Sequence, residues 1–206
     1  MLYYLAIWIV VPIFWLLYRP RILNLRRTRT KGRAVYVCNH FSLADPVILC
    51  AITPRFLHIM AKSDLFKDGI GRLFFKLLLA FPVARKTADL KSVKRAIRLI
   101  EKGNAFAIFP EGTRSKSGEI LPLENGAAFI ARHARSPIIP VYIHPSIWRR
   151  FKLRGAVGEP IDCATAIAAC PEMKPDEAIT AAIARALQEL KTQVETDITR
   201  ECGSMR

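Results

Sequence analysis

The sequence predicts an α/β protein: a single domain with a mixed, largely parallel sheet flanked by helices, preceded by an N-terminal hydrophobic membrane helix. Short apolar runs alternate with stretches of helical periodicity, the pattern of strands followed by helices. The 206 residues suffice for one domain with a proper core and are too few for two of ordinary size. We expect a membrane anchor helix over 1–18, a basic linker over 19–33 and a catalytic domain over 34–206 that includes a C-terminal amphipathic helix.

Residues 2–18 are uncharged and predominantly apolar, as in a membrane anchor. As a helix this stretch would span ~26 Å, against a hydrocarbon core of ~30 Å. It lacks the positive start and the small-residue cleavage site of a signal peptide. Residues 19–33 carry seven Lys or Arg and no acid, so the positive-inside rule places the rest at the cytoplasmic face of a membrane, the inner membrane in a bacterium. A buried core helix is the alternative interpretation.

The predicted strands are short apolar runs bounded by Pro, Gly or polar residues. They cover residues 34–38, 56–60, 81–84, 105–109 and 138–143. Predicted helices fill the intervals: 47–52, 64–80, 90–102 and 123–133, with a closing helix from about Asp176. The helix over 90–102 places Val93, Ile97 and Ile100 on one face and lysine and arginine on the other, so it is amphipathic.

The charge and composition indicate an anionic membrane partner. The formal net charge is +15, and 51% of the residues are hydrophobic. A chain that is both apolar and basic suits the surface of an anionic membrane. Nucleic acid is the rival partner, but the sequence has no zinc-ligand spacing, no RNA-binding aromatic signature and no clear helix-turn-helix pattern. We therefore expect no nucleic-acid binding.

The five cysteines are odd in number and contain no C-x-x-C pair, which argues against a disulfide framework and against a zinc site. We therefore expect the protein to reside in a reducing compartment. Cys38 lies in an apolar predicted strand, so we interpret it as a small buried hydrophobe and not as a nucleophile.

His40 and Asp45 directly follow the first predicted strand, in the sequence Asn-His-Phe-Ser-Leu-Ala-Asp-Pro. A continuous helix would turn side chains five residues apart ~140° from each other, so a direct pair requires a turn between them. In such a turn, Asp45 would accept a hydrogen bond from one imidazole nitrogen and leave the other free to take a proton from an alcohol. The alternative is structural, because Asp followed by Pro is also a helix N-cap with Pro at the first helical position.

The second candidate site is the loop Phe-Pro-Glu-Gly-Thr-Arg-Ser over residues 109–115, at the end of another predicted strand. Its glycine, hydroxyl groups and Arg114 suit a loop that receives a phosphate. An ordinary turn is the alternative interpretation of the same residues.

Together, the two motifs closely resemble the lysophosphatidate acyltransferase family of glycerolipid acyltransferases. That family's Asn-His-x-Ser-x-x-Asp motif is matched by Asn39, His40, Ser42 and Asp45, and its Phe-Pro-Glu-Gly-Thr-Arg-Ser loop is matched at each position from Phe109 to Ser115. Lys62 and Arg85 also match weaker elements of the family, in the same order along the chain. The resemblance covers about residues 34–161.

The resemblance implies transfer of a fatty acyl group from a thioester of coenzyme A or acyl carrier protein to the free hydroxyl of lysophosphatidic acid, giving phosphatidic acid in phospholipid biosynthesis. His40 would be the general base and Asp45 its orienting partner, with no covalent intermediate, no cofactor and no metal. The implied substrate-binding residues are Lys62, Arg85, Glu111, Gly112, Thr113, Arg114 and Ser115. Arg85 and Arg114 would hold the acceptor's phosphate, and Glu111 would position the glycerol or brace the loop.

One departure from the family pattern leaves the acceptor open. The family has a basic residue in a Lys-x-Gly element after the phosphate loop, whereas this chain has Leu-Glu-Asn-Gly over 123–126. The same chemistry on another lysolipid, amino-acid-linked or phosphocholine-bearing, is therefore an alternative. A non-enzymatic basic membrane scaffold is a second alternative, in which His40 and Asp45 would be structural.

Overall fold

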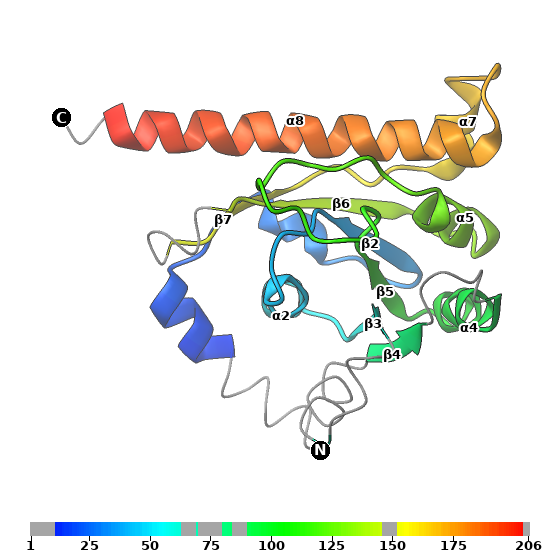
Figure 1. Ribbon diagram of the computed structural model, residues 1–206, viewed down its shortest axis with the longest axis horizontal. Coiled ribbons are helices and arrows are strands. Elements are labelled where there is room, and N and C mark those ends of the chain that lie inside the picture. The colour runs from blue at the N-terminus through cyan, green and yellow to red at the C-terminus, as the bar shows by residue number, and fades with distance from the viewer. Residues whose placement is uncertain (1–10, 63–68, 70–79, 84–89, 146–151, 204–206) are drawn as a thin grey trace.

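Seven strands form one sheet in the part of the chain that the structure, a computed structural model, describes: residues 11–62, 69, 80–83, 90–145 and 152–203 (Figure 1). The strand order is β1-β7-β6-β2-β5-β3-β4. All neighbouring strands are parallel except β6 and β7. The prediction of an α/β domain with a mixed, largely parallel sheet is therefore confirmed.

The centre of the sheet consists of β2 (Ala34–Cys38), β5 (Ala105–Ile108) and β6 (Ile138–Ile143). Every residue of β2 and β6 is buried, which explains why these strands are continuous apolar runs. β2 pairs with β6 on one side and with β5 on the other, so the carboxyl ends of β2 and β5 lie next to each other. β3 (Leu57–Lys62) and β4 (Ala80–Val83) extend the sheet beyond β5.

Hydrophobic core residues lie on both faces of the sheet, because successive side chains of a strand alternate between faces. On one face, Tyr36 and Cys38 of β2 pack with α2 (Asp45–Ile52). On the other face, Val35 and Val37 pack with four helices: α4 (Leu90–Glu101), α5 (Gly126–His133), α7 (Cys163–Ala168) and α8 (Pro175–Gly203). In Figure 1 the long helix α8 lies alongside β6 and β7, and it contacts both strands.

The predicted N-terminal membrane helix is wrong. No helix in the described residues is both long and apolar enough to cross a membrane. Residues 11–18 form a helix that packs on the domain, because Phe14 is buried in the same core as α2 and the ring of Tyr18 packs against it at 4.9 Å between centroids. An uncharged apolar run satisfies a protein core as well as a bilayer, and hydropathy alone does not separate the two. Residues 2–10 lie outside the described part.

Residues 19–33, which we expected to be a basic linker, contain β1 (Arg21–Leu23) and the 3-10 helix η1 (Leu25–Thr28). β1 pairs in parallel with β7 (Arg154–Val157) at the edge of the sheet. Arg21 also forms ion pairs with Asp197 and Glu201 of α8, so some of the basic charge is used within the domain.

Candidate active site

The sheet brings the two sequence motifs together. His40 follows β2 and residues 109–115 follow β5, and these strands are parallel neighbours. Loops at the carboxyl ends of parallel strands meet at one edge of the sheet, the usual place for sites in α/β proteins. His40 and Glu111 are 71 positions apart in sequence and are nevertheless in direct contact.

His40 and Asp45 form a direct pair. The His40 Nδ1 atom lies 2.8 Å from Asp45 Oδ2, and the Asp45 side chain is fully buried at the start of α2. The same Oδ2 atom accepts hydrogen bonds from the backbone N–H groups of Phe41 and Ser42, each at 2.8 Å. A tight turn thus supplies the reversal that a continuous helix could not. Among the described residues, the other carboxylate oxygen, Oδ1, is buried without a hydrogen-bond partner.

This geometry fixes the imidazole in one tautomer. A carboxylate only accepts hydrogen bonds, so the proton lies on Nδ1 and the Nε2 lone pair is left to act as a base. The ring is also held by stacking on Phe109, with 4.4 Å between centroids and 29° between planes. The pair can therefore deprotonate an alcohol that approaches Nε2.

The backbone of His40 is bound by the loop after β5. Its N–H donates to Glu111 Oε1 at 2.8 Å, and its carbonyl oxygen accepts from the Ser115 N–H at 2.8 Å. The second carboxylate oxygen of Glu111 accepts from the Leu121 N–H at 3.1 Å. Glu111 therefore connects the histidine to two parts of the loop and contributes to the position of the base.

Burial raises the pKa of Glu111, and the N–H groups of His40 and Leu121 oppose this rise because they stabilise the carboxylate. Burial also raises the pKa of the Cys38 thiol. Cys38 is fully buried beside the site, and a thiol in such surroundings is not a nucleophile.

The remaining loop residues differ in their exposure. Thr113 and Arg114 are exposed, so they are available to a ligand, whereas Ser115 is buried and its Oγ accepts from the Gly118 N–H at 3.1 Å. Gly112 has a φ of +64°, a left-handed conformation that favours glycine. A Cβ added there would lie 2.4 Å from Glu124 Oε1. The backbone of the loop is thus held at Gly112 and Ser115, while the Thr113 and Arg114 side chains face solvent.

Asn39 holds the end of β2 against the end of β6. Its Nδ2 donates to the Ile143 carbonyl at 2.9 Å, and its Oδ1 accepts from the Ile143 N–H at 2.8 Å. This two-way bond fixes the backbone that leads into His40. The sequence analysis matched Asn39 to the motif but did not predict this structural role. The one sequence feature that could have indicated it is the position of Asn39 between a buried strand and the histidine.

Two predicted binding residues receive no structural test. Arg85 lies outside the described residues, and of Lys62 only the backbone, at the end of β3, is described. Phe109 was matched within the loop, but its stacking on His40 was not anticipated. In the part of the chain that the structure describes, no group of His, Cys, Asp or Glu is arranged to hold a metal ion.

Comparison with known proteins identifies a family model and related enzymes. The model of the family described as Acyltransferase matches residues 19–144. The 1-acyl-sn-glycerol-3-phosphate acyltransferase of Bacillus subtilis (strain 168) is 33% identical over 181 residues, which cover 85% of this chain and 89% of that protein. The enzyme of the same name from Cocos nucifera is 34% identical over 127 residues, but these cover 59% of this chain and 41% of that protein.

A solved structure has the same fold. The 1-acyl-sn-glycerophosphate acyltransferase PlsC from Thermotoga maritima superposes with a TM-score of 0.66, covering 93% of this chain and 81% of that one. Its sequence identity is 19%, so this likeness concerns the fold alone.

Proposed function

The chain belongs to the acyltransferase family, and we propose that it transfers a fatty acyl group from an acyl thioester to the free hydroxyl of lysophosphatidic acid, giving phosphatidic acid. The enzyme class follows from the family. The acceptor, the donor and the roles of individual residues are the parts that we propose.

The observation that carries the proposal is the pairing of His40 with Asp45 next to the loop over residues 109–115. A base oriented by a buried carboxylate, next to a loop with an exposed arginine, suits the acylation of a hydroxyl on a phosphate-bearing acceptor. In a scaffold without activity, nothing would require one ring nitrogen of His40 to be held as a free base.

In the proposed reaction, His40 Nε2 takes the proton of the acceptor hydroxyl as its oxygen attacks the thioester carbonyl carbon. The new C–O bond forms, and collapse of the tetrahedral intermediate breaks the C–S bond. The imidazolium then returns the proton to the leaving thiolate, so that no covalent acyl-enzyme forms. Asp45 stabilises the imidazolium while it exists, because its Oδ2 bonds directly to Nδ1.

Arg114 would bind the acceptor's phosphate, with the hydroxyl of Thr113 beside it. Both side chains are exposed on the loop whose backbone is bonded to His40. Arginine binds phosphate through charge-assisted and often bidentate hydrogen bonds. Lys62 and Arg85 remain proposed contributors to substrate binding on the family pattern.

We also propose that the donor is a thioester of coenzyme A or acyl carrier protein and that the reaction takes place at an anionic membrane surface. The net charge of +15 supports the second point, because basic residues are attracted to anionic lipid headgroups. An acceptor with a fatty acyl chain is itself a membrane component.

The test incubates the purified full-length protein with a mixed pool of lysolipids in detergent and, in parallel reactions, with an acyl-coenzyme A or an acyl carrier protein thioester. Mass spectrometry identifies the acylated product. We expect phosphatidic acid to dominate. Acylation of a phosphocholine or amino-acid-linked lysolipid in preference would reject the acceptor while keeping the chemistry. No acylated product with any lysolipid, from either thioester donor, would reject the proposal.

A further inference from the structure

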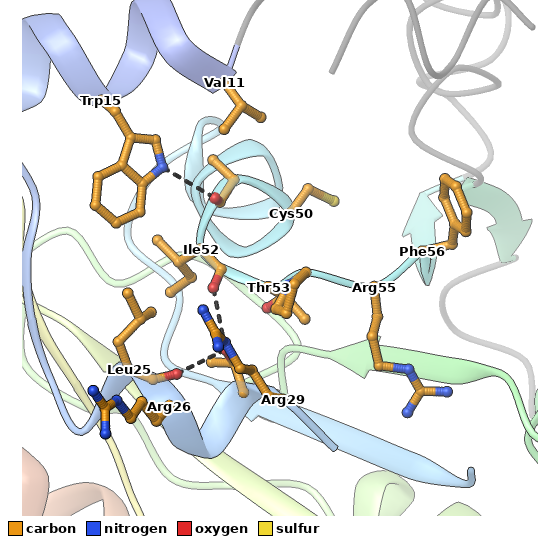
Figure 2. Close-up of a pocket in the computed structure, with 13 residues that line it drawn as sticks. Val11, Trp15, Leu25, Arg26, Arg29, Cys50, Ile52, Thr53, Arg55 and Phe56 are labelled. Atoms are coloured by element: carbon orange, nitrogen blue, oxygen red, sulfur yellow. Dashed lines mark hydrogen bonds between the residues drawn. The ribbon is translucent and has the colours of Figure 1, made fainter. Parts of the chain in front are cut away.

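A pocket of about 720 Å³ lies away from His40, between the helix over residues 11–18, η1 and the end of α2 (Figure 2). Its volume is within the range of small-molecule sites, roughly 300–1,000 Å³. α2 begins at Asp45 and ends at Ile52, so the His40–Asp45 pair and this pocket lie at opposite ends of one helix. Arg29 and Thr53 precede β2 and β3, which places the pocket at the edge of the sheet opposite the loops of the candidate active site.

The lining combines apolar walls with cations. Trp15, Leu25 and Phe56 are among the apolar residues. In Figure 2, Arg29 lies near the middle of the lining, whereas Arg26 and Arg55 extend to opposite sides of it. The Trp15 Nε1–H donates to the Ala51 carbonyl at 3.3 Å, which fixes the indole against α2. The pocket is thus formed by contacts between elements that are distant in sequence.

Among the residues that the structure describes, three arginines and no acidic residue line the pocket: Arg26, Arg29 and Arg55. Arg55 is held by hydrogen bonds to Thr30 Oγ1 at 3.1 Å and to the Gly103 carbonyl at 2.9 Å, neither of which neutralises its charge. Arg26 and Arg29 form no ion pair with any residue that the structure describes, unlike Arg27, which pairs with Glu159. An anionic ligand would neutralise the positive charge of these arginines.

A buried hydroxyl supplies an independent observation. Thr53 lines the pocket and is 5% exposed, and its Oγ1 has no hydrogen-bond partner in the described structure. The Oγ1 atom is itself buried, so it reaches a ligand in the pocket by rotation of its side chain. Buried hydroxyl groups normally have a partner, and such a rotation would supply one. By contrast, the hydroxyl of Thr28, which also lines the pocket, donates to the Leu25 carbonyl at 2.8 Å.

We propose that this pocket is a second, non-catalytic binding site for an anionic membrane phospholipid. Arg29 would bind the phosphate of the headgroup, and Arg26 and Arg55 would add positive charge around it. The Thr53 side chain, once rotated, would donate to a phosphate oxygen, and the apolar walls would contact an acyl chain. The helix over 11–18 exposes Leu16 and Leu17 beside the pocket-lining Trp15, an apolar surface that suits a lipid and not a free phosphate.

The test uses Trp15 as a reporter in the full-length chain. Replacing Trp8 and Trp148 by Phe leaves Trp15 as the sole tryptophan of the three. The probe is a short-chain phosphatidylglycerol with brominated acyl chains, kept below its micelle concentration, because bromine quenches a tryptophan that it contacts. We expect saturable quenching, about tenfold weaker binding of the matching phosphatidylcholine, and no displacement by inorganic phosphate.

Variants locate the bound lipid. Arg26→Gln with Arg29→Gln should weaken phosphatidylglycerol binding about tenfold or more. The matched control, Lys91→Gln with Lys94→Gln, removes the same charge from exposed positions of α4 and should change binding less than about twofold. Thr53→Val should weaken binding and also raise the melting temperature, because valine has the same shape without an unpaired hydroxyl. A loss of binding caused only by unfolding would lower that temperature.

His40→Ala and Arg114→Gln should bind the probe as the parent protein does, so the result does not depend on the proposed reaction. Weaker binding in Arg114→Gln would place the lipid in the substrate site and overturn the inference. If the lysine double variant lost as much lipid binding as the arginine double variant, the effect would be general charge attraction. If inorganic phosphate displaced the lipid probe, the pocket would be a site for free anions. Either outcome would also overturn the proposal.

Discussion

Glu111 Oε1 accepts a hydrogen bond from the backbone N–H of His40 at 2.8 Å, so the proposed base is held by a residue of the neighbouring strand's loop. The Ser115 N–H completes the connection by donating to the carbonyl of the same histidine. The position of the imidazole is therefore determined by β2 and β5 together. Glu111 acts here as a positioning residue.

Glu111→Gln should lower kcat with a smaller effect on the KM of either substrate. Glutamine has one carbonyl oxygen, whereas two backbone donors, of His40 and Leu121, bond to the carboxylate. One of them would lose its partner, at a cost of ~1–3 kcal/mol for a buried donor. Steady-state kinetics on both substrates measures the split. Glu119→Gln, an exposed glutamate of the same segment, is the matched control and should behave as wild type.

His40→Ala should reduce turnover by roughly 10²- to 10⁴-fold while the protein stays folded, because general-base catalysis contributes about that factor. His133→Ala removes an exposed histidine of α5 and should leave turnover unchanged. Circular dichroism and melting temperature check the fold of both variants. Near wild-type activity in a folded His40→Ala protein would remove His40 from the mechanism.

Asp45→Asn should also reduce turnover strongly, for a different reason. The amide would place either an oxygen or an NH₂ group where Oδ2 now accepts three hydrogen bonds, from His40 Nδ1 and from two backbone N–H groups. An NH₂ group facing Nδ1 would favour the tautomer that is protonated at Nε2, which is not a base. The activity loss should persist across the pH range where the fold is intact. Recovery of full activity at high pH would contradict this tautomer argument.

Arg114→Ala should raise the KM of lysophosphatidic acid more than that of the thioester. A charge-assisted hydrogen bond is worth ~1.5–3 kcal/mol, or about tenfold to a hundredfold in KM. Lys116→Ala, an exposed cation two residues along the loop, controls for general charge and should have a small effect. If Arg114→Ala changed both KM values equally, or neither, its role in binding the acceptor's phosphate would be wrong. Arg85→Ala is expected to behave as Arg114→Ala does.

The sequence predicted the parts of the fold and of the site that depend on local pattern. β2, β5 and β6 are recognisable as short continuous apolar runs, and α4 by the helical period of its apolar residues. The His40–Asp45 pair closes within one turn. β1, β7 and α7 were missed. β1 has three residues within a basic run and β7 contains Arg154 and Gly155, so their strand character comes from pairing across the sheet edge. The bond from Glu111 to His40 depends on the order of strands, which no local pattern encodes.

The packing of the N-terminal segment could not be predicted from local sequence pattern either. Its lack of charge predicted an anchor, but the structure shows a one-sided helix: Phe14 is 8% exposed in the core with α2, while Leu16 is 77% exposed. If residues 11–18 belong to the core, Phe14→Ala should destabilise the whole domain.

We expect the Phe14→Ala variant of the full-length protein to lose ~3 kcal/mol in its free energy of unfolding, since replacing a buried Phe by Ala removes apolar contacts and leaves a cavity. Leu16→Ala, in the same helix and equally apolar, should cost less than about 0.5 kcal/mol because its side chain already faces solvent. Urea unfolding in detergent, followed by circular dichroism, measures both under identical conditions. Equal and small losses would mean that the helix does not pack on the sheet, whereas a large loss confined to Phe14→Ala would confirm that the apolar run completes the core around α2.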